Sequence, residues 1–409
     1  MVWVFQVQQA RPLAECLQFE NSLNIHGRHN TVRHTMRITP LTNPRFLYRT
    51  PTSPQVKDGQ EELSVLGHAV SAGMTVASAV RAGIHYGQLM VGALMDDSPL
   101  PLQDKIHRAD VMDRAISKHR RTYTSRPAPP LGEDSPLKEL PAARLKRPFM
   151  MVPGWDMAHD RFLTFTSKLT DDGANGGATF YIQNGQFFAD RDCREPLTTE
   201  QIPKEAKVFV TVFNGLGESP EETAPQVAAN LQALRAVTGE QTPDLLAYSQ
   251  GGLATRRFLD TTDTSVGKLM MLGTPNKGAG LADLSKLMYN AQDNGYDVDF
   301  LMASEHLDVD DENSIRFMAT DSPKLRALND RWEQQMAHTE GFKIVGSGQD
   351  STLHWGWPLL KSGDTMVEVE NLAPDGVEAH LIQDGPWVNH RDLPYNAQVY
   401  LQAKDHFGW

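Results

Sequence analysis

Cysteine is nearly absent from this sequence, whose 409 residues contain only Cys16 and Cys193, far apart and in unlike surroundings. Two such residues cannot form a disulfide framework, and they lack the CxxC spacing of a thiolate metal site. The pattern excludes a disulfide-stapled module and predicts no metal site, while the redox compartment stays open.

Positive charge is also in deficit. Lys and Arg number 39 against 51 Asp and Glu, which gives a formal net charge of -12 and a pI near 5.6. Binding to a phosphate backbone needs clustered Lys and Arg. The sequence therefore predicts no nucleic acid partner.

A conventional export signal is missing too. The first residues, MVWVFQVQQA, have neither the basic start nor the apolar core of about 7 to 15 residues that a secretory signal requires. Residues 21–57 contain six Lys or Arg and no Asp or Glu. We expect residues 1–60 to be a flexible arm, with a transit peptide as the sharper alternative. The protein is expected in the cytoplasm or exported by a non-standard route.

Charge is sparse in residues 61–95, where Arg81 is the only formal charge after Glu62. The stretch is long enough to span a bilayer, but Gly, Ser, Thr and His dilute its hydrophobicity. Two interpretations follow: a helix embedded in or associated with a membrane, or a helical hairpin packed on the main domain. Together with the polar run Leu102 to Arg121, the stretch 61–95 is expected to form a helical extension over residues 61–125. Pro, Gly and charge then mark a linker over residues 126–146.

From residue 147 to 409, short apolar runs alternate with helix-length patterns, which predicts an α/β domain with a mostly parallel sheet and crossover helices. Asn184-Gly185 marks a hairpin between two alternating runs. Residues 281–340 have no strand pattern and are rich in helix formers, so we expect a helical cap there. The expected strands are FMMV (149–152), KVFVTVF (207–213), DLLAY (244–248), KLMML (268–272), FKIVGSG (342–348) and VEAHLI (377–382).

The stretch AYSQGG, residues 247–252, places Ser249 between the DLLAY strand and a helix. It is one glycine short of GxSxG, the strand-turn-helix elbow that exposes a nucleophilic serine. A serine hydroxyl is a weak nucleophile, so a hydrolase also needs a base, a carboxylate that orients the base, and donors for the oxyanion. Two carboxylates follow the FKIVGSG strand, Asp350 and Asp364, and either could orient the base.

Two motifs in the right order resemble those of lipases and esterases with the α/β-hydrolase fold, including relatives of lecithin:cholesterol acyltransferase. AYSQGG is similar to their AHSxGG elbow, and LGTPNKGAG is similar to their LGTPHxGS turn. The resemblance covers residues 147–409 and implies that Ser249 is the nucleophile and that Gln250 donates one oxyanion N–H. MVPGW resembles the family's HG-containing oxyanion turn, with Pro153 where many lipases have His, which makes the N–H of Trp155 the second donor.

The same resemblance selects the acid and the base. GDTMVEVEN is similar to the family's GDGxVxxxS stretch, which favours Asp364 over Asp350 as the orienting acid. Three histidines follow both acids. His390 matches the family's NHxDL stretch and is the expected base, whereas His380 is expected to be a core residue of a strand and His406 a surface residue.

The resulting hypothesis is a serine hydrolase that cleaves carboxylic esters, with a small-molecule or lipid substrate and no metal or organic cofactor. In the resembling lipases an insertion before the acid-bearing strand covers the site, so the cap is a candidate lid. The alternatives are an acyltransferase or phospholipase on the same triad and a non-catalytic, hydrolase-like binding protein. Residues 61–95 are the candidate for lipid-interface contact, and the oligomeric state stays open.

Overall fold

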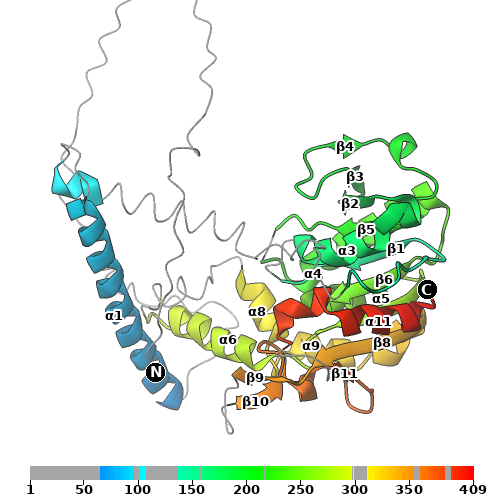
Figure 1. Cartoon of the computed structure of the whole chain (residues 1–409). Helices are drawn as coiled ribbons and strands as arrows, with labels where there is room; N and C mark the ends of the chain where they lie inside the picture. The colour runs from blue at the N-terminus through cyan, green and yellow to red at the C-terminus, as the bar shows by residue number, and fades with distance from the viewer. Residues whose placement is uncertain are drawn as a thin grey trace, which may run out of the picture. The chain divides into compact units, whose positions relative to one another are not determined.

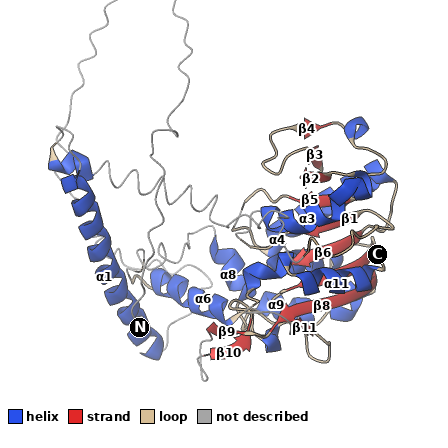
Figure 2. Ribbon diagram, viewed as in Figure 1, coloured by secondary structure: helices blue, strands red, loops and turns tan. Residues whose placement is uncertain are grey.

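The computed structural model describes residues 65–95, 101–106, 137–155, 159–215, 217–296, 298, 311–353, 360–382 and 388–409. Within these residues the strands form one large sheet and one separate hairpin, drawn in Figures 1 and 2. The sheet contains β1 (Phe149–Val152), β2 (Thr179–Gln183), β3 (Gln186–Phe188), β4 (Pro196–Leu197), β5 (Val208–Thr211), β6 (Asp244–Tyr248), β7 (Val266–Leu272), β8 (Thr339–Ser347) and β11 (His380–Ile382); the hairpin consists of β9 (Asp350–Leu353) and β10 (Leu360–Gly363).

The large sheet has nine strands in the order β11-β8-β7-β6-β1-β5-β2-β3-β4. Neighbouring strands from β11 to β2 are parallel, and β3 and β4 add an antiparallel edge. The antiparallel step is the hairpin predicted at Asn184-Gly185 between β2 and β3. The predicted α/β architecture with a mostly parallel sheet is therefore confirmed.

Helices connect the parallel strands and cover both faces of the sheet. The helices are α1 (Val65–Met95), α3 (Leu163–Thr170), α4 (Pro220–Thr238), α5 (Gln250–Leu259), α6 (Gly280–Asp293), α8 (Glu312–Met318), α9 (Pro323–Asn329), α10 (Trp332–Met336) and α11 (Ala397–Phe407), with short 3-10 turns η2 (His159–Phe162), η3 (Asp171–Gly176), η4 (Thr199–Gln201), η6 (Val369–Asn371) and η7 (His390–Tyr395).

The core lies in two layers, one on each face of the sheet. Successive side chains of a strand point to opposite faces. On β6, Leu245 and Ala247 pack with α4 and α5, whereas Leu246 and Tyr248 pack with α3 and α11. All four side chains are buried, which explains why DLLAY is continuously apolar after Asp244 instead of alternating with polar residues.

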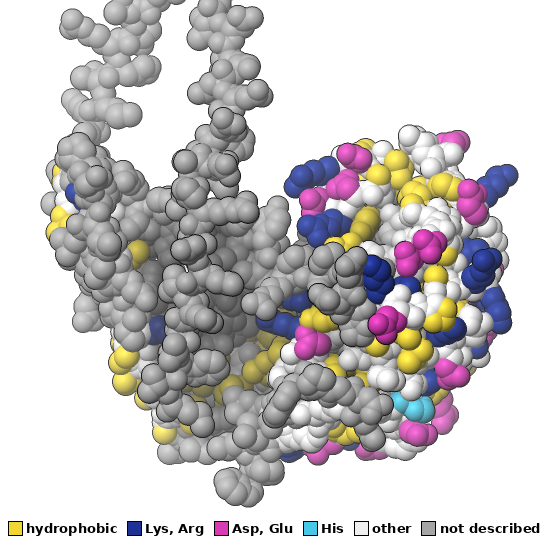
Figure 3. Space-filling model, in the orientation of Figure 1, with side chains coloured by type: hydrophobic (Ala, Val, Ile, Leu, Met, Phe, Trp, Pro, Cys, Tyr) yellow, Lys and Arg dark blue, Asp and Glu magenta, His cyan; other side chains and the backbone are white. Residues whose placement is uncertain are grey.

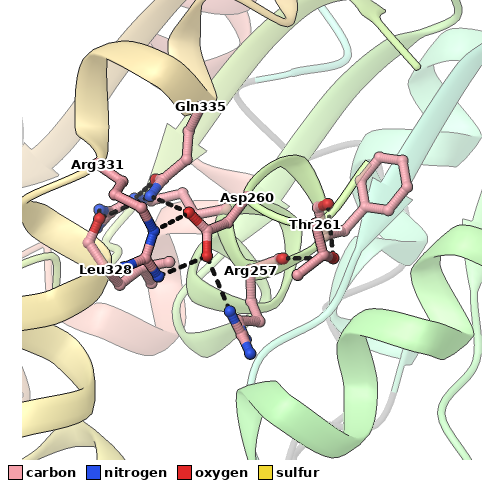
Figure 4. A network of polar contacts seen from close by, with 8 residues as sticks. Arg257, Asp260, Thr261, Leu328, Arg331 and Gln335 are labelled. Carbon is pink, nitrogen blue, oxygen red and sulfur yellow. Dashed lines mark hydrogen bonds and ion pairs between the residues drawn. The ribbon is translucent and has the colours of Figure 1, made fainter. Parts of the chain in front are cut away.

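A partly exposed ion cluster around the Asp260 carboxylate fixes the C-terminal end of α5 (Figure 4). Asp260 follows the helix and accepts hydrogen bonds from Arg331 Nε at 2.6 Å and Nη2 at 2.7 Å. Arg257 Nη1 donates to the same carboxylate at 2.8 Å. A two-point arginine contact fixes orientation as well as distance. The cluster therefore anchors the helix that begins directly after Ser249 against the residues around α10.

The predicted cap, residues 281–340, divides into two structural parts where it is described. Helices α6, α8 and α9 share an apolar cluster with Leu253 of α5 and Trp155. In contrast, α10 packs on the sheet through Trp332 and Met336, as a crossover helix between β7 and β8 would. The part of the predicted cap that shares an apolar cluster with Leu253 and Trp155 is thus smaller than the full range 281–340.

The predicted linker is wrong in its second part. Leu137, Ala143 and Leu145 are buried in the core that also contains α3 and α11, and Ala143 N donates to Tyr400 Oη at 2.9 Å. A composition rich in Pro and charge argues against a helix or a strand, but it does not prevent a few apolar residues from anchoring an irregular segment. The core domain therefore includes residues before 147. Residues 126–136 lie outside the described part of the chain.

The apolar stretch after residue 64 forms one continuous helix, α1, and the predicted helical hairpin is wrong. Glycine weakens a helix by only about 1 kcal/mol relative to alanine, so the glycines do not end it. His68 Nδ1 lies 2.9 Å from the Tyr296 hydroxyl. No helix in the described ranges has both the length and the apolar character needed to cross a membrane. Residues 1–60 and 107–121 lie outside these ranges.

On the face shown in Figure 3, basic and acidic side chains of the described residues are interspersed. No single-sign field of the kind that attracts a polyanion is visible there.

Candidate active site

Ser249 occupies a sharp turn between β6 and α5, with φ 54° and ψ -130°. Positive φ is rare for a residue with a side chain, and it persists only when the surroundings enforce it. Ser249 is partly exposed, whereas its neighbours Tyr248 and Gln250 are buried. The turn therefore presents one hydroxyl at the surface of an otherwise buried strand end.

Close packing explains the glycines of the AYSQGG stretch. A Cβ on Gly252 would lie 2.1 Å from Thr274 Oγ1, and a Cβ on Gly251 would lie 2.3 Å from the carbonyl oxygen of Pro153. Both distances are too short for any side chain. In contrast, Ala247 is fully buried in the sheet core, where its methyl group is accommodated. The missing first glycine of GxSxG is thus tolerated at Ala247.

His390 lies between Ser249 and Asp364. Its Nε2 is 2.8 Å from Ser249 Oγ, and its Nδ1 is 2.7 Å from Asp364 Oδ2. An ionised carboxylate can only accept hydrogen bonds, so Nδ1 carries the proton and Nε2 is left to accept from the serine hydroxyl. The structure therefore brings three sequence-predicted residues into one hydrogen-bonded chain.

The carboxylate of Asp364 is held from both sides. Asp364 is fully buried, and its Oδ1 accepts from Val367 N at 2.8 Å and Met366 N at 3.1 Å. The backbone N–H of His390 donates to the carbonyl oxygen of Asp364 at 2.6 Å. Two hydrogen bonds therefore join the acid to the histidine, and two more from the backbone fix the orientation of the carboxylate.

One further residue, Tyr248, which the sequence did not single out, contacts the histidine. Tyr248 Oη donates to the carbonyl oxygen of His390 at 2.7 Å, and the two rings lie 5.1 Å apart. Burial raises the pKa of Tyr248 well above its ordinary value, and the Asp364 charge adds to the effect. Tyr248 therefore stays a neutral donor. The position of Tyr248 directly before Ser249 is the sequence signal from which a role in the site could have been inferred.

The expected oxyanion turn lies directly against the serine. A Cβ on Gly154 would be 2.6 Å from Ser249 Cβ, so Gly154 allows the turn after β1 to approach the nucleophile. Trp155 follows, and Gln250 is the first residue of α5, where backbone N–H groups have no partner within the helix. The two expected backbone donors therefore belong to segments next to the serine: Gln250 directly follows Ser249, and Trp155 directly follows Gly154.

The Gln250 side chain has a role that the sequence did not reveal. Its Nε2 donates to Ser314 Oγ at 2.5 Å and to the carbonyl oxygen of Glu218 at 3.1 Å. Ser314 is buried in α8, one of the cap helices. The residue after the serine thus ties the elbow to the cap.

The remaining candidates lie elsewhere. Asp350 begins β9, and its backbone pairs with Gly363, the residue before Asp364; its side chain lies outside the described part. His380 is exposed at the start of the edge strand β11, so the expectation of a core histidine is wrong. His406 is not on the surface as expected: it is half-buried, and its Nε2 lies 3.1 Å from the carbonyl oxygen of Leu269.

A metal centre has no support in this part of the molecule. Among the described residues, no group of three or more His, Cys, Asp or Glu side chains is arranged to hold an ion.

No family model matches the sequence, and no curated protein matches it either. Among solved structures, the lipase BlEst2 of Bacillus licheniformis in its propeptide form is similar at 14% identity and a TM-score of 0.41. The match covers 68% of this chain and 52% of that chain, so this chain spans about half of that form. The mature form is matched over 93% of its length, with the same identity and TM-score.

Two other solved structures are similar at comparable distance. The product of the gene lin2722 from Listeria innocua is 14% identical, with coverage of 64% of this chain and 93% of that chain and a TM-score of 0.40. Phospholipase PlaB from Legionella pneumophila is 12% identical, with coverage of 56% and 46% and a TM-score of 0.37. Such distant likeness carries no conclusion about chemistry.

The strand order and the site together define the class of fold. A strained serine follows β6, in the middle of a mostly parallel sheet, and its carboxylate and histidine partners follow it in the chain order Ser, Asp, His. This is the arrangement of the α/β-hydrolase fold. The chain has that fold, as the sequence motifs predicted.

Proposed function

We propose that this protein is a serine hydrolase that cleaves carboxylic esters through an acyl-enzyme on Ser249. The observation that carries the proposal is the continuous hydrogen-bonded chain from Ser249 Oγ to His390 Nε2 and from His390 Nδ1 to Asp364 Oδ2, at 2.8 and 2.7 Å. Such an array turns a weak hydroxyl nucleophile into a reactive one, because the histidine accepts its proton.

In the proposed reaction, Ser249 Oγ attacks the ester carbonyl carbon while its proton moves to His390 Nε2. The carbonyl electrons form an oxyanion, which the N–H groups of Trp155 and Gln250 stabilise. Collapse expels the alcohol, which takes the proton from His390, and leaves the acyl group on Ser249. Water then attacks the acyl-enzyme with His390 again accepting a proton, and collapse releases the acid and returns that proton to Ser249.

Asp364 acts through the histidine in this scheme. Its negative charge stabilises the imidazolium that forms in each half-reaction, and its contact with Nδ1 holds the productive tautomer. Complete burial favours this role, because electrostatic interactions are stronger away from water.

The surroundings of the serine support an apolar acyl group. Trp155 follows the oxyanion turn and packs with the cap cluster, and Leu253, one turn into α5, belongs to the same cluster. Apolar groups that line a site favour substrates that bury apolar surface, at about 25 cal/mol per Å². We therefore propose esters of apolar acids as substrates.

The proposal is tested with p-nitrophenyl esters of graded acyl-chain length, using the full chain and its Ser249→Ala variant. We expect ester hydrolysis by the wild type and a loss of about 10⁴-fold or more in kcat for Ser249→Ala. Ser265→Ala is the matched control, because Ser265 is exposed and lies in the loop before β7. Equal rates for the wild type and Ser249→Ala would refute a serine mechanism.

A further inference from the structure

Arg161, in the turn η2 that follows the oxyanion segment, is a buried cation with no hydrogen-bond or ion-pair partner in the described part of the chain. Its exposed fraction is 3%, and its Nε is buried without a hydrogen-bond acceptor. Among the residues that the structure describes, no carboxylate lies within ion-pair distance of its guanidinium. Removing an unpaired charge from water costs free energy, which buried arginines normally offset through anions or a full set of acceptors.

Arg256, also deeply buried among the described residues, shows what a satisfied guanidinium looks like in this fold. Arg256 is fully buried, and its Nε donates to Gln335 Oε1 at 3.0 Å, its Nη1 to Asn276 Oδ1 at 2.9 Å, and its Nη2 to the carbonyl oxygen of Leu328 at 3.2 Å. Its guanidinium carbon also lies 4.6 Å from the centre of the Trp332 ring. The isolation of Arg161 is therefore a particular feature and not a general property of buried arginine here.

Arg161 lies beside the candidate active site. The ring of its neighbour Phe162 is 6.3 Å from the ring of Tyr248, whose hydroxyl contacts the backbone of His390. The Arg161 charge also opposes the burial that raises the pKa of Tyr248, which places the guanidinium within electrostatic reach of that hydroxyl. The same chain segment begins at Gly154, which touches Ser249.

A second donor on this segment is also unsatisfied. Trp155 Nε1 is buried and has no hydrogen-bond partner in the described part of the molecule. Both orphan groups are donors, and both belong to the short stretch from the oxyanion turn to η2. Neither donor has an acceptor among the described residues, and the partner that suits the Arg161 guanidinium best is a negatively charged one.

We propose that Arg161 binds a negatively charged group of the ester substrate, a carboxylate or a phosphate close to the scissile bond. The proposal deepens the proposed function and rests on it. The anion would arrive with the substrate and pair with the guanidinium. The free energy that the unpaired charge costs in the free protein would then be recovered on binding a charged ester, but not on binding a neutral one. A protein with a formal net charge of -12 repels anions at long range, so selection of such an ester requires a local cation.

The first experiment compares matched esters in the full chain and in Arg161→Gln. On the acyl side, p-nitrophenyl hemiglutarate is compared with p-nitrophenyl valerate, which has the same number of acyl carbons without the carboxylate. On the alcohol side, 1-butyrylglycerol 3-phosphate is compared with 1-butyrylglycerol. We expect Arg161→Gln to lower kcat/KM for one charged ester by about 10- to 100-fold, as for loss of a charged hydrogen bond, and to leave both neutral esters within about twofold. The pair that responds identifies the carboxylate or the phosphate.

Arg391→Gln is the matched control, because Arg391 is an exposed arginine directly after His390. An exposed charge is screened by salt, so any preference that Arg391 confers should disappear at high ionic strength, whereas the Arg161 effect should persist. Arg161→Lys should restore part of the preference, since it keeps the charge without the planar geometry of arginine.

Thermal unfolding provides a second measurement that does not depend on catalysis. Inorganic phosphate at constant ionic strength should raise the Tm of the wild type and leave that of Arg161→Gln unchanged, and without phosphate Arg161→Gln should be at least as stable as the wild type. Equal loss of activity on charged and neutral esters, or a lower Tm of Arg161→Gln without phosphate, would overturn the assignment. A wild type that hydrolyses no ester would refute the proposed function instead, while the phosphate effect would still test Arg161.

Discussion

Replacing Asp364 with asparagine changes the hydrogen-bonded chain at one atom. Asp364 Oδ1 accepts from the backbone N–H groups of Met366 and Val367, so the amide oxygen of asparagine would take that position. The amide nitrogen would then face His390 Nδ1, where Oδ2 lies at 2.7 Å in the native site. Because an amide N–H can only donate there, Nδ1 would have to accept, and the proton would move to Nε2.

The magnitude follows from that tautomer. With its proton on Nε2, His390 cannot accept the proton of Ser249, although the imidazole ring stays in place. The same tautomer change in a serine protease lowers kcat by about 10⁴-fold, and we expect a loss of that order for Asp364→Asn. The assay is kcat on a p-nitrophenyl ester, with circular dichroism and Tm to show that the variant is folded.

Asp350→Asn is the control for this experiment. The backbone of Asp350 pairs with Gly363, next to Asp364, so the two aspartates share one region of the fold. We expect Asp350→Asn to keep kcat within about threefold of the wild type, as for a change that leaves the nucleophile and base intact. A loss of about a thousandfold or more for Asp350→Asn, with Asp364→Asn nearly silent, would refute the assignment of the acid.

Three further predictions concern stability. Burial lowers the pKa of His406 from 6.5 to about 4, so stability that is fully present above pH 6.5 should be lost as the pH falls toward 4. Because the ring is partly exposed and solvent screens it, we expect this loss to be about 1–2 kcal/mol. His406→Gln should flatten the loss in urea titrations across the range, and an unchanged pH dependence would contradict it. Gly252→Ala should cost about 1–3 kcal/mol in denaturant unfolding through its clash with Thr274, while Gly73→Ala, with no described atom within 4 Å, should not destabilise. Tyr248→Phe should cost about 1–3 kcal/mol by leaving a buried carbonyl oxygen unpaired, and no change in unfolding free energy would argue against that bond.

The sequence predicted the parts of the fold that have a local cause. The strand DLLAY, the hairpin at Asn184-Gly185 and the long helix α4 depend on apolar runs and turn chemistry within a few residues. The elbow at Ser249 has a local signal too, because Gly251 and Gly252, which permit its close packing, follow it within three residues. Resemblance to known motifs supplied the pairing of Asp364 with His390, which lie far from Ser249 in the chain.

Features that depend on tertiary packing could not be predicted in this way. Burial of Ala143 requires Tyr400, which lies 257 residues further along the chain. His380 was expected in the core because its strand is apolar, but β11 is an edge strand and the side chain is exposed. The isolation of Arg161 is a matter of what surrounds it in space, and no pattern around residue 161 indicates it.

The central claim is that Ser249 is an activated nucleophile, and covalent labelling tests it most directly. The full chain is incubated with a serine-directed alkyl phosphonate bearing a p-nitrophenyl leaving group, and intact mass spectrometry is followed by peptide mapping. We predict one phosphonyl adduct per chain on Ser249, with no adduct on Ser249→Ala and slower labelling of Asp364→Asn. An unlabelled wild type, or an adduct that persists in Ser249→Ala, would contradict the claim and favour a protein that binds ligands without cleaving them.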